Sequence, residues 1–551
     1  MKKIVTLFTI LVLGFNSWAQ SKQQVEHLSA LAQVWGFLKY YHPAASKGMP
    51  DWDAELVKMI PKVKAVRSQK EWELLMATWY QSLPEARMAA IKSQPKGDSV
   101  IRVFNEHDIK QLPVSKSLQQ QFLKLYQYHL PDSSKYFTNT YKTYKLDYVR
   151  HIEDSYADQP YPSEELRLLS LFRYWNVINY FYPHKALITN DWRQVLTQYI
   201  PVFLQATDSM AYRTVVHQLT REIHDSHSFF SHKEWNKRFQ YTPPFTIYYL
   251  NGKYVIGESK YDSLMKLFDL RLGDEIVAIE GKTVKQCETE LLALFDGTNT
   301  LSKYRNVAAY LLAGADSTMN VRFKRGQQLL EKEIGRYAAS FLFQLRVRKQ
   351  QSLWKQVEPG IWYVDFCSIR NPDTLQKLFH DIKDAKSVIW DMRDYPYFPV
   401  TQQMGRGFFP VKTYLEDNYN ASADFPGVFT KQAYFFEPHV EDTTPVYKGR
   451  LIVLVGEHTQ SLSESIAASL RSRENTIVMG RQTAGTTGNI TFFDLPGNIQ
   501  VSYTAVAVHG SSNSFRQKQG VKIDKPITIT VEKLQRSPDY ALEEAVREAK
   551  R

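Results

Sequence analysis

The spacing of apolar residues changes along the chain and divides it into four segments. Residues 20–165 and 166–235 repeat apolar positions every three to four residues, which predicts amphipathic helices. In residues 240–336 the period falls to two, which predicts half-buried strands. Residues 337–551 alternate short apolar runs with helical stretches, the pattern of an α/β layer with parallel strands. The expected architecture is two helical domains, a β-rich domain and an α/β core.

The two helical segments carry an internal repeat. Nine residues of the first recur in the second at a constant offset of 140 positions, which predicts two copies of one unit. They are Leu28, Leu31, Trp35, Tyr40, Pro43, Asp51, Trp52, Ile60 and Pro61. At this offset Arg87 lies opposite His227, which favours a chemical role for His227, unless the first copy has merely drifted. Residues 85–165 predict a loop-rich helical linker without chemical groups.

Residues 240–336 hold two hairpin signals. The segments Phe245–Leu250 and Lys253–Ile256 flank Asn251-Gly252, a dipeptide typical of tight hairpin turns, and a second hairpin is predicted over Met319–Ile334. Between them, Leu272–Lys282 (LGDEIVAIEGK) resembles the signature of PDZ domains. The resemblance implies a domain that binds peptide termini by strand addition, or one that packs as a spacer without binding a terminus.

The stretch Leu451–Asn489 organises the α/β core. It predicts, in order, a strand at Leu451–Val455, a helix at Ser463–Arg471 and a strand at Thr476–Met479. Ser461 lies at the turn into the helix, where free N–H groups and the positive end of the helix dipole stabilise an oxyanion. This position suits a nucleophile, although Ser461 and Glu464 also form the pattern of a helix capping box.

Further elements of the core follow from the same rules. Strands are predicted at Ile361–Phe366, Ser387–Trp390, Ile499–Val508 and Ile527–Val531, and a helix at Thr374–Ile382. A final helix is predicted to begin with Ser537 as its cap and Pro538 in its first turn.

A serine nucleophile needs a base, and the candidate is His227 in the segment His224–Ser228 (HDSHS). An imidazole within hydrogen-bond reach is the usual means of activating a serine hydroxyl. For a single histidine considered without its context, the default interpretation is a structural residue with satisfied hydrogen bonds. The spacing of His224 and His227 also permits a metal pair, but no third cluster of ligands stands nearby, so no metal site is expected.

Two motifs of the core resemble a known family. Thr459–Glu464 (TQSLSE), followed by Gly480–Gly485 (GRQTAG), resembles the nucleophile region of the C-terminal-processing (tail-specific) and tricorn-core serine peptidases. The resemblance covers roughly residues 220–551. It implies ClpP/crotonase-like α/β layers, hydrolysis of peptide bonds without a cofactor, and Ser461 as the nucleophile.

The family has two branches, which differ in their base. One branch pairs the serine with a lysine 25 residues later, where this chain has Thr486. The tricorn-like branch uses a histidine next to a serine from an upstream helical segment, and Ser226-His227 resembles that pair. Its fourth member is a glutamate that corresponds to Gln517, which can hydrogen-bond but carries no charge. The resemblance therefore implies the tricorn-like branch, with impaired catalysis as the alternative.

The sequence identifies the donors of the oxyanion hole less clearly than it identifies the nucleophile and the base. The amide of Leu462, directly after the serine, is one expected donor. In the family a strand ending in Asp-x-Arg runs into glycines that supply the other donor, whereas here Asp391-Met392-Arg393 continues into Asp394–Pro399 with two prolines. The amide of Tyr395, or alternatively that of Tyr397, is the expected substitute. Asp391 and Arg393 themselves predict a structural ion pair.

Composition argues against other classes. The formal charge is +12, from 69 Lys+Arg against 57 Asp+Glu, but no run concentrates it, so nucleic-acid binding is not expected. The sequence has no HExxH zinc pair, no GxSxG elbow and no phosphate-binding glycine loop. Cys287 and Cys367 fall in different predicted domains, so two buried thiols are expected rather than a disulfide.

Residues 1–19 have the pattern of a secretory signal peptide. Lys2 and Lys3 precede an apolar stretch that is too short for a permanent membrane anchor, and Ser17-Trp18-Ala19 forms a small-x-small cleavage site. The protein is therefore expected in the periplasm or outside the cell. The leading hypothesis is an exported serine endopeptidase that acts on proteins or peptides. The alternatives are an inactive peptide-binding protein and a hydrolase of esters or glycans, and the sequence does not indicate an oligomeric state.

Overall fold

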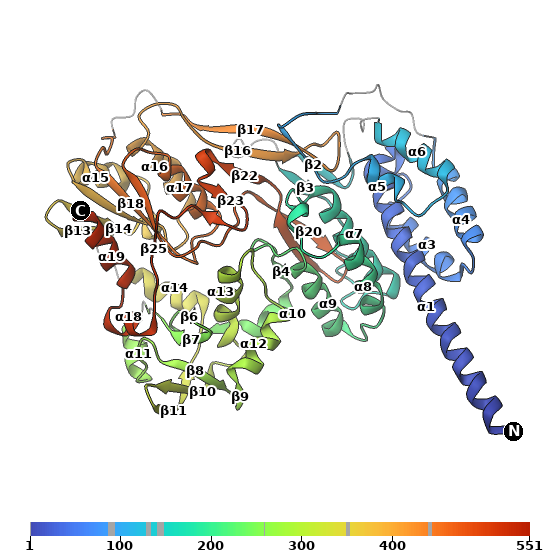
Figure 1. Ribbon diagram of the computed structural model, residues 1–551, viewed down its shortest axis with the longest axis horizontal. Helices are drawn as coiled ribbons and strands as arrows, with labels where there is room; N and C mark the ends of the chain where they lie inside the picture. The colour runs from blue at the N-terminus through green and yellow to red at the C-terminus, as the bar shows by residue number, and fades with distance from the viewer. Residues whose placement is uncertain are drawn as a thin grey trace. The chain divides into compact units, whose positions relative to one another are not determined.

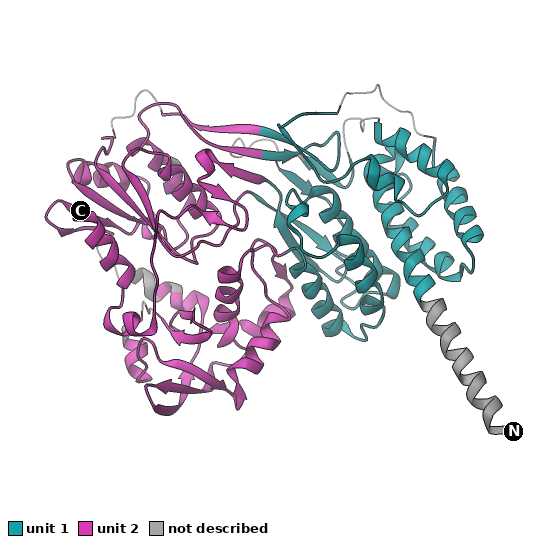
Figure 2. Ribbon diagram, viewed as in Figure 1, with its two compact units in different colours: residues 1–223, 419–431, 489–506 teal, residues 224–418, 432–488, 507–551 magenta. Residues whose placement is uncertain are grey.

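The computed structural model describes residues 22–85, 94–127, 134–139, 148–257, 259, 261–348, 353–438 and 444–551, with the backbone alone of residues 2–21, 262, 343, 345–348 and 402. Contacts group the chain into two compact units (Figure 2). Unit 1 comprises residues 1–223, 419–431 and 489–506, and unit 2 comprises residues 224–418, 432–488 and 507–551. The predictions on the signal peptide and on Arg87 concern side chains outside the described residues.

Unit 1 contains two helical copies with the same order of elements (Figure 1). The first copy has α1 (Lys2–Tyr41), α3 (Trp52–Ala65) and α4 (Gln69–Gln81), and the second has α7 (Glu164–Phe181), α8 (Trp192–Leu204) and α9 (Ser209–Arg221). Asp51 caps α3 and Asp191 caps α8, each by accepting hydrogen bonds from amides of the first turn. The caps are thus offset by 140 residues, like the helices.

A reciprocal pair of tryptophans locks each copy. In the first copy the indole of Trp35 donates to the carbonyl of Trp52 at 2.9 Å, and the indole of Trp52 donates back to the carbonyl of Trp35 at 3.0 Å. In the second copy Trp175 and Trp192 exchange the same two bonds, at 2.6 and 3.1 Å. Because the same buried donors are satisfied in the same way at matching positions, the predicted repeat is confirmed.

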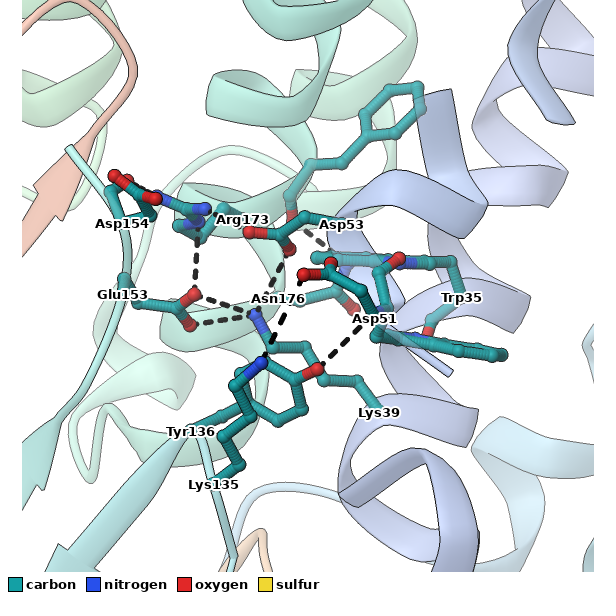
Figure 3. Close-up of polar contacts among 12 residues, drawn as sticks. Trp35, Lys39, Asp51, Asp53, Lys135, Tyr136, Glu153, Asp154, Arg173 and Asn176 are labelled. Carbon is teal, nitrogen blue, oxygen red and sulfur yellow. Dashed lines mark hydrogen bonds and ion pairs between the residues drawn. The ribbon is translucent and has the colours of Figure 1, made fainter. Parts of the chain in front are cut away.

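The linker between the copies contributes to a buried charge cluster, which we define as Lys39, Asp53, Glu153 and Arg173 (Figure 3). Lys39 Nζ donates to both carboxylate oxygens of Glu153, at 2.7 and 2.8 Å. Arg173 Nη2 donates to Asp53 at 2.5 Å, and Arg173 Nε lies 3.1 Å from Glu153. The prediction of a linker without chemical groups therefore missed Glu153, which neutralises cations from both helical copies.

The other elements of unit 1 are short. They are α2 (Pro43–Ser46), β1 (Val100–Arg102), α5 (Glu106–Lys110), α6 (Lys116–Gln127), β2 (Phe137–Asn139), β3 (Val149–His151), η1 (Lys185–Leu187), β20 (Ile490–Leu495) and β21 (Ile499–Thr504). None of the helices that the structure describes combines the length and the apolar character required to cross a membrane.

Unit 2 begins with a β-rich sheet of strand order β11-β10-β8-β7-β6, with β9 paired to β8. Its strands are β6 (Ile247–Leu250), β7 (Lys253–Ile256), β8 (Glu275–Ile279), β9 (Lys282–Thr283), β10 (Thr318–Arg325) and β11 (Gln328–Gly335). Helices α11 (Asp262–Leu267), α12 (Val284–Leu292) and α13 (Thr300–Leu311) accompany it. Antiparallel pairing of β6 with β7 and of β10 with β11 confirms both predicted hairpins.

The second part of unit 2 is the α/β core. Its sheet has the order β13-β14-β15-β18-β19-β25, antiparallel between β13 and β14 and parallel elsewhere. The strands are β13 (Trp354–Glu358), β14 (Ile361–Val364), β15 (Ser387–Asp391), β18 (Arg450–Val455), β19 (Thr476–Gly480) and β25 (Lys525–Pro526). The helices are α15 (Thr374–Ile382), α17 (Leu462–Arg471) and α19 (Tyr540–Ala549). The predicted strand, helix, strand unit around Ser461 is thus confirmed.

From Leu451 to Val455, strand β18 is apolar because both of its faces are covered (Figure 1). Leu451, Val453 and Val455 belong to the cluster that contains α15 and α17, whereas Ile452 and Leu454 belong to the cluster that contains α19. Side chains that alternate between two buried faces require the continuous apolar run seen in the sequence.

The end of the chain differs from its prediction. Ile499–Val508 is not one strand, because β21 ends at Thr504 and β22 (Ala507–Gly510) starts anew. Ile527–Val531 is not a strand: β25 covers only Lys525–Pro526, and the Thr530 side chain caps α18 (Val531–Arg536). Thr530 offers the backbone a helix cap, which overrides the β propensity of this β-branched run. The last helix is capped by Asp539, two residues after the predicted Ser537.

The remaining elements of unit 2 are short, and the residues of two further strands are divided between unit 1 and unit 2. The connecting elements are β4 (Phe230–Ser231), α10 (Lys233–Asn236), η2 (Lys237–Phe239), β5 (Tyr241–Thr242), β12 (Tyr337–Ala338), α14 (Ala339–Arg348), η3 (Phe366–Ser368), α16 (Phe398–Met404), η4 (Gly405–Gly407), β22, η5 (Ser511–Asn513), β23 (Phe515–Arg516), β24 (Gly520–Val521) and α18. The shared strands are β16 (Thr413–Ala421) and β17 (Val428–Phe436).

Candidate active site

Ser461 occupies a strained turn at the start of α17. Its backbone has φ 58° and ψ −120°, whereas a residue that only caps a helix normally has extended backbone angles. A non-glycine residue in this region costs about 1–3 kcal/mol, and such strain gathers at functional sites. Capping alone does not explain this conformation.

Glu464 holds the turn in place. Its buried carboxylate accepts hydrogen bonds from the amide of Ser461 at 3.2 Å, from Thr483 Oγ1 at 2.5 Å, and from the amides of Gly485 and Thr486 at 2.7 and 3.0 Å. Burial raises the pKa of Glu464 to about 7, against these bonds, which favour the ionised form. The capping box predicted for Ser461 and Glu464 therefore exists, but its glutamate also ties the turn to the Thr483–Thr486 loop.

The histidine loop follows α9 and groups with unit 2 rather than with the helical copy that precedes it. His227 is 3 % exposed and Asp225 is 5 % exposed. The loop is held from one side by the segment before α13. Ser226 N donates to Thr298 Oγ1 at 2.7 Å, and Ser226 Oγ accepts from the amide and the hydroxyl of Thr298, both at 3.0 Å. His224 Nδ1 lies 2.5 Å from Asp296 Oδ2.

The histidine loop and the serine turn meet directly. Gln460 Nε2, one residue before Ser461, donates to the carbonyl of Ser226 at 3.3 Å across 234 positions of sequence. Arg305 on α13 donates to Gln460 Oε1 at 2.8 Å and to the carbonyl of Glu457 at 2.7 Å. The residues adjacent in sequence to the candidate nucleophile and to the candidate base are therefore hydrogen-bonded to each other.

Thr486 connects the remaining candidates. Its carbonyl accepts from the amide of Ser461 at 2.9 Å, and its hydroxyl donates to Asp225 Oδ1 at 3.0 Å. Gln517 Nε2 donates to the same hydroxyl at 3.1 Å. Thr486 stands at the position of the lysine in the other branch of the family, so a residue that cannot act as a base here links the serine, the aspartate and the glutamine.

The loop after β15 borders the serine turn. Ser463 Oγ donates to the carbonyls of Met392 and Asp394, at 3.1 and 2.8 Å, which brings this loop to the first turn of α17. Leu462 is the first residue of α17, so its amide has no partner within the helix. The amide of Tyr395 donates to Asp394 Oδ1 at 2.8 Å, so oxyanion binding by Tyr395 requires that bond to open. Both donors remain predictions.

Asp391 and Arg393 form the structural ion pair that was predicted. Arg393 Nη2 lies 2.6 Å from Asp391 Oδ2, and Arg393 Nη1 lies 2.7 Å from Asp539 Oδ1 at the cap of α19. Cys367 and Cys287 are free thiols as expected, although only Cys367 is fully buried. Burial raises the pKa of the Cys367 thiol, which makes it unreactive.

The electrostatic surroundings of His227 suit a base. Burial lowers the pKa of His227, the charge of Asp225 opposes this effect, and the charge of Arg305 adds to it. A lowered pKa keeps the imidazole neutral near pH 7, which is the form that accepts a proton.

Sequence reasoning missed the residues that join the two loops. Thr298, Asn299 and Arg305 belong to the β-rich part of the chain, and each contacts the site. Asn299 Nδ2 donates to the carbonyls of Thr483, Ala484 and Lys518 at 2.8 to 3.2 Å. The only sequence signal was that Asn299 and Ser302 form a capping box for α13, which predicts a helix start but not its contacts.

Comparison with known proteins relates part of the chain to a peptidase family. Residues 400–527, which include the serine turn, match the model of peptidase family S41. No curated protein sequence matches the chain. The solved structure of mature CPAF complexed with lactacystin aligns with a TM-score of 0.52 at 11 % identity, over 70 % of this chain and 98 % of CPAF, and a second structure of mature CPAF gives the same score.

A photosystem II D1 C-terminal processing protease aligns with a TM-score of 0.41 at 15 % identity, over 66 % of this chain and 93 % of that protein. The CPAF alignments show that the mixed α/β fold is shared. Residues 400–527, which carry Ser461, are the segment similar to peptidase family S41, the serine peptidases that the motif around Ser461 resembles.

Proposed function

We propose that the protein is an exported endopeptidase that hydrolyses peptide bonds with Ser461 as nucleophile and His227 as base. The observation that carries this proposal is the hydrogen bond from Gln460 to Ser226, which joins the serine turn to the histidine loop. The strained backbone of Ser461 supports it, because capping alone does not require that conformation.

In this mechanism the hydroxyl oxygen of Ser461 attacks the carbonyl carbon of the scissile bond, and its proton passes to His227. The tetrahedral oxyanion is stabilised by the amide of Leu462 and by a second donor from the Tyr395 loop. Collapse breaks the C–N bond, and His227 returns the proton to the leaving amine. Water then hydrolyses the acyl-enzyme ester by the same steps.

Ser226 and Gln517 act in this scheme by orienting other groups. The Ser226 hydroxyl is fixed by Thr298, and its carbonyl is fixed by Gln460. Gln517 bonds Thr486 and thereby the carboxylate of Asp225. The β-rich sheet with α13 is the PDZ-like part of the proposal. Its contacts through Asn299 and Arg305 support at least a positioning role for it.

The experiment uses full-length protein recovered from the periplasm or the culture medium, where a mature N-terminus at Gln20 is expected. A fluorophosphonate probe should label the wild type, and neither Ser461→Ala nor His227→Ala should be labelled above background. A quenched peptide with both ends blocked should be cleaved only by the wild type. Ser472→Ala, at the far end of α17, serves as the matched control and should retain labelling.

The pH profile gives a second readout. Because burial lowers the pKa of His227, labelling should stay constant near pH 7 and fall only below the usual histidine value of about 6.5. A folded wild-type protein without labelling, or labelling that survives Ser461→Ala, would contradict the proposal. Binding of the peptide without turnover would instead favour the inactive peptide-binding alternative.

A further inference from the structure

The site needs a carboxylate, and Gln517 does not supply one. In the described part of the chain Gln517 Oε1 is buried without a hydrogen-bond partner, and Nε2 donates to Thr486. The Ser226 hydroxyl accepts its hydrogen bonds from Thr298. Gln517 therefore neither carries charge nor bonds the residue next to the base.

The hydrogen bonds run in one direction, toward Asp225. The hydroxyl of Thr486 accepts from Gln517 Nε2, so its single proton is left for Asp225 Oδ1, 3.0 Å away. The amide of His227 donates to the same oxygen at 2.9 Å. Two donors therefore converge on one oxygen of Asp225, whose side chain is 5 % exposed.

We propose that Asp225 is the positioning carboxylate of this site: it acts on His227 from its own loop, while Thr486 and Gln517 hold it in place. This inference rests on the proposed function. In the tetrad of the tricorn-like branch, the carboxylate would come from position 517. In this chain position 517 is a glutamine, and we assign the role of the carboxylate to Asp225. Asp225 stabilises the imidazolium that forms when Ser461 attacks, the role that a carboxylate plays in serine hydrolases.

Two opposite charges act on His227. Asp225 favours the protonated imidazole, and Arg305 on α13 disfavours it. Burial lowers the pKa of Arg305 to about 10, and the charges of Glu464 and Glu457, which lie on the serine side of the site, oppose this effect. Removing the charge of Asp225 should therefore lower the pKa of His227 further. Adding a carboxylate at position 517 should raise it.

The test measures the rate of fluorophosphonate labelling between pH 5 and pH 9 on full-length protein. Asp225→Asn keeps an oxygen for the amide of His227 but loses the charge. Its plateau rate should fall by roughly tenfold or more, and the midpoint of its acid limb should move to lower pH by roughly one unit. Asp373→Asn, an exposed aspartate near α15, is the control and should behave as wild type.

A charge swap distinguishes positioning from simple loss of structure. Gln517→Glu alone should move the acid midpoint to higher pH, which also tests the idea if Asp225→Asn does not fold. The double variant Asp225→Asn/Gln517→Glu should recover most of the lost rate. If folded Asp225→Asn keeps the wild-type plateau and midpoint, or the double variant is no faster than Asp225→Asn, Asp225 does not have this role. A wild-type enzyme that is not labelled at Ser461 would overturn the proposed function as well.

Discussion

The buried charge cluster of unit 1 and the candidate site of unit 2 both remove polar groups from water, but they balance them differently. The cluster pairs two cations, Lys39 and Arg173, with two carboxylates, Asp53 and Glu153, and all four side chains are at most 8 % exposed (Figure 3). Among the described residues, each region buries polar atoms without a hydrogen-bond partner, which are Asp53 Oδ1 and Arg173 Nε in the cluster and Gln517 Oε1 in the site. The site differs from the cluster in the strained backbone of Ser461 and in the neutral side chain of Gln517.

The difference separates a structural network from a chemical one. Buried charges that form ion pairs of opposite sign fix the relative placement of the segments that carry them, here the two helical copies and the linker. Backbone strain costs stability and persists where the surrounding structure imposes it, as the bonds to Glu464 and Thr486 do around Ser461. The contrast predicts that substitutions in the two regions have opposite consequences for stability and activity.

The largest effect is expected for Arg173→Met in the buried charge cluster. Loss of the guanidinium leaves two carboxylates against Lys39 alone, and breaking a buried pair costs about 3–5 kcal/mol. Urea unfolding of unit 1 should report this loss, while labelling of Ser461 in protein that remains folded should be unchanged. Lys58→Met, which removes an exposed pair with Glu55, should have no measurable effect. If Arg173→Met is as stable as the wild type, the buried charge cluster does not stabilise unit 1.

A smaller effect is expected at Glu416, where a substitution should increase the stability of unit 2 at high pH rather than decrease it. Burial raises the pKa of Glu416 on β16 from 4.5 to about 7, and hydrogen bonds to Asn418 and Ser465 only partly offset this. The folded state therefore binds the proton more tightly, so stability from this group is fully present below pH 4.5 and is lost as the pH rises through about 7.

Glu416→Gln should remove that dependence and stabilise unit 2 at pH 8 by on the order of 2–3 kcal/mol. Asp53 behaves in the opposite way, because Arg173 and Lys39 overcome its burial and lower its pKa below 3.8. Its contribution is present above that value and is lost only at lower pH. Urea midpoints from about pH 2 to pH 8 measure both, and a Glu416→Gln profile parallel to wild type would show that Glu416 is not responsible.

The smallest effect concerns the strain at Ser461. Glycine adopts positive φ freely, so Ser461→Gly should be more stable than Ser461→Ala by about 1 kcal/mol, after the entropy cost of glycine in the unfolded chain is subtracted. Neither variant should be labelled. A urea titration measures the free energy of unfolding of both variants. Equal values would show that the backbone of residue 461 is not strained.

The sequence by itself determined the local elements and their repeat. The apolar run of β18, the capping box at Ser461, the Asn251-Gly252 hairpin and the offset of 140 between the tryptophan pairs all depend on residues close in sequence or on direct comparison of two segments. Such signals are local, because propensity, capping and periodicity are set within one turn or one strand. The chemical candidates Ser461 and His227 also came from motifs.

Only the tertiary structure decided which side chains support these candidates. Thr298 and Arg305 on the β-rich part, Thr486 after β19 and Glu153 in the linker carry no sequence signal for their roles, because each acts through a contact with a distant segment. The same holds for Gln517, whose partner is Thr486. A hydrogen bond across hundreds of residues depends on how layers pack, and that packing is a property of the whole fold rather than of any local pattern.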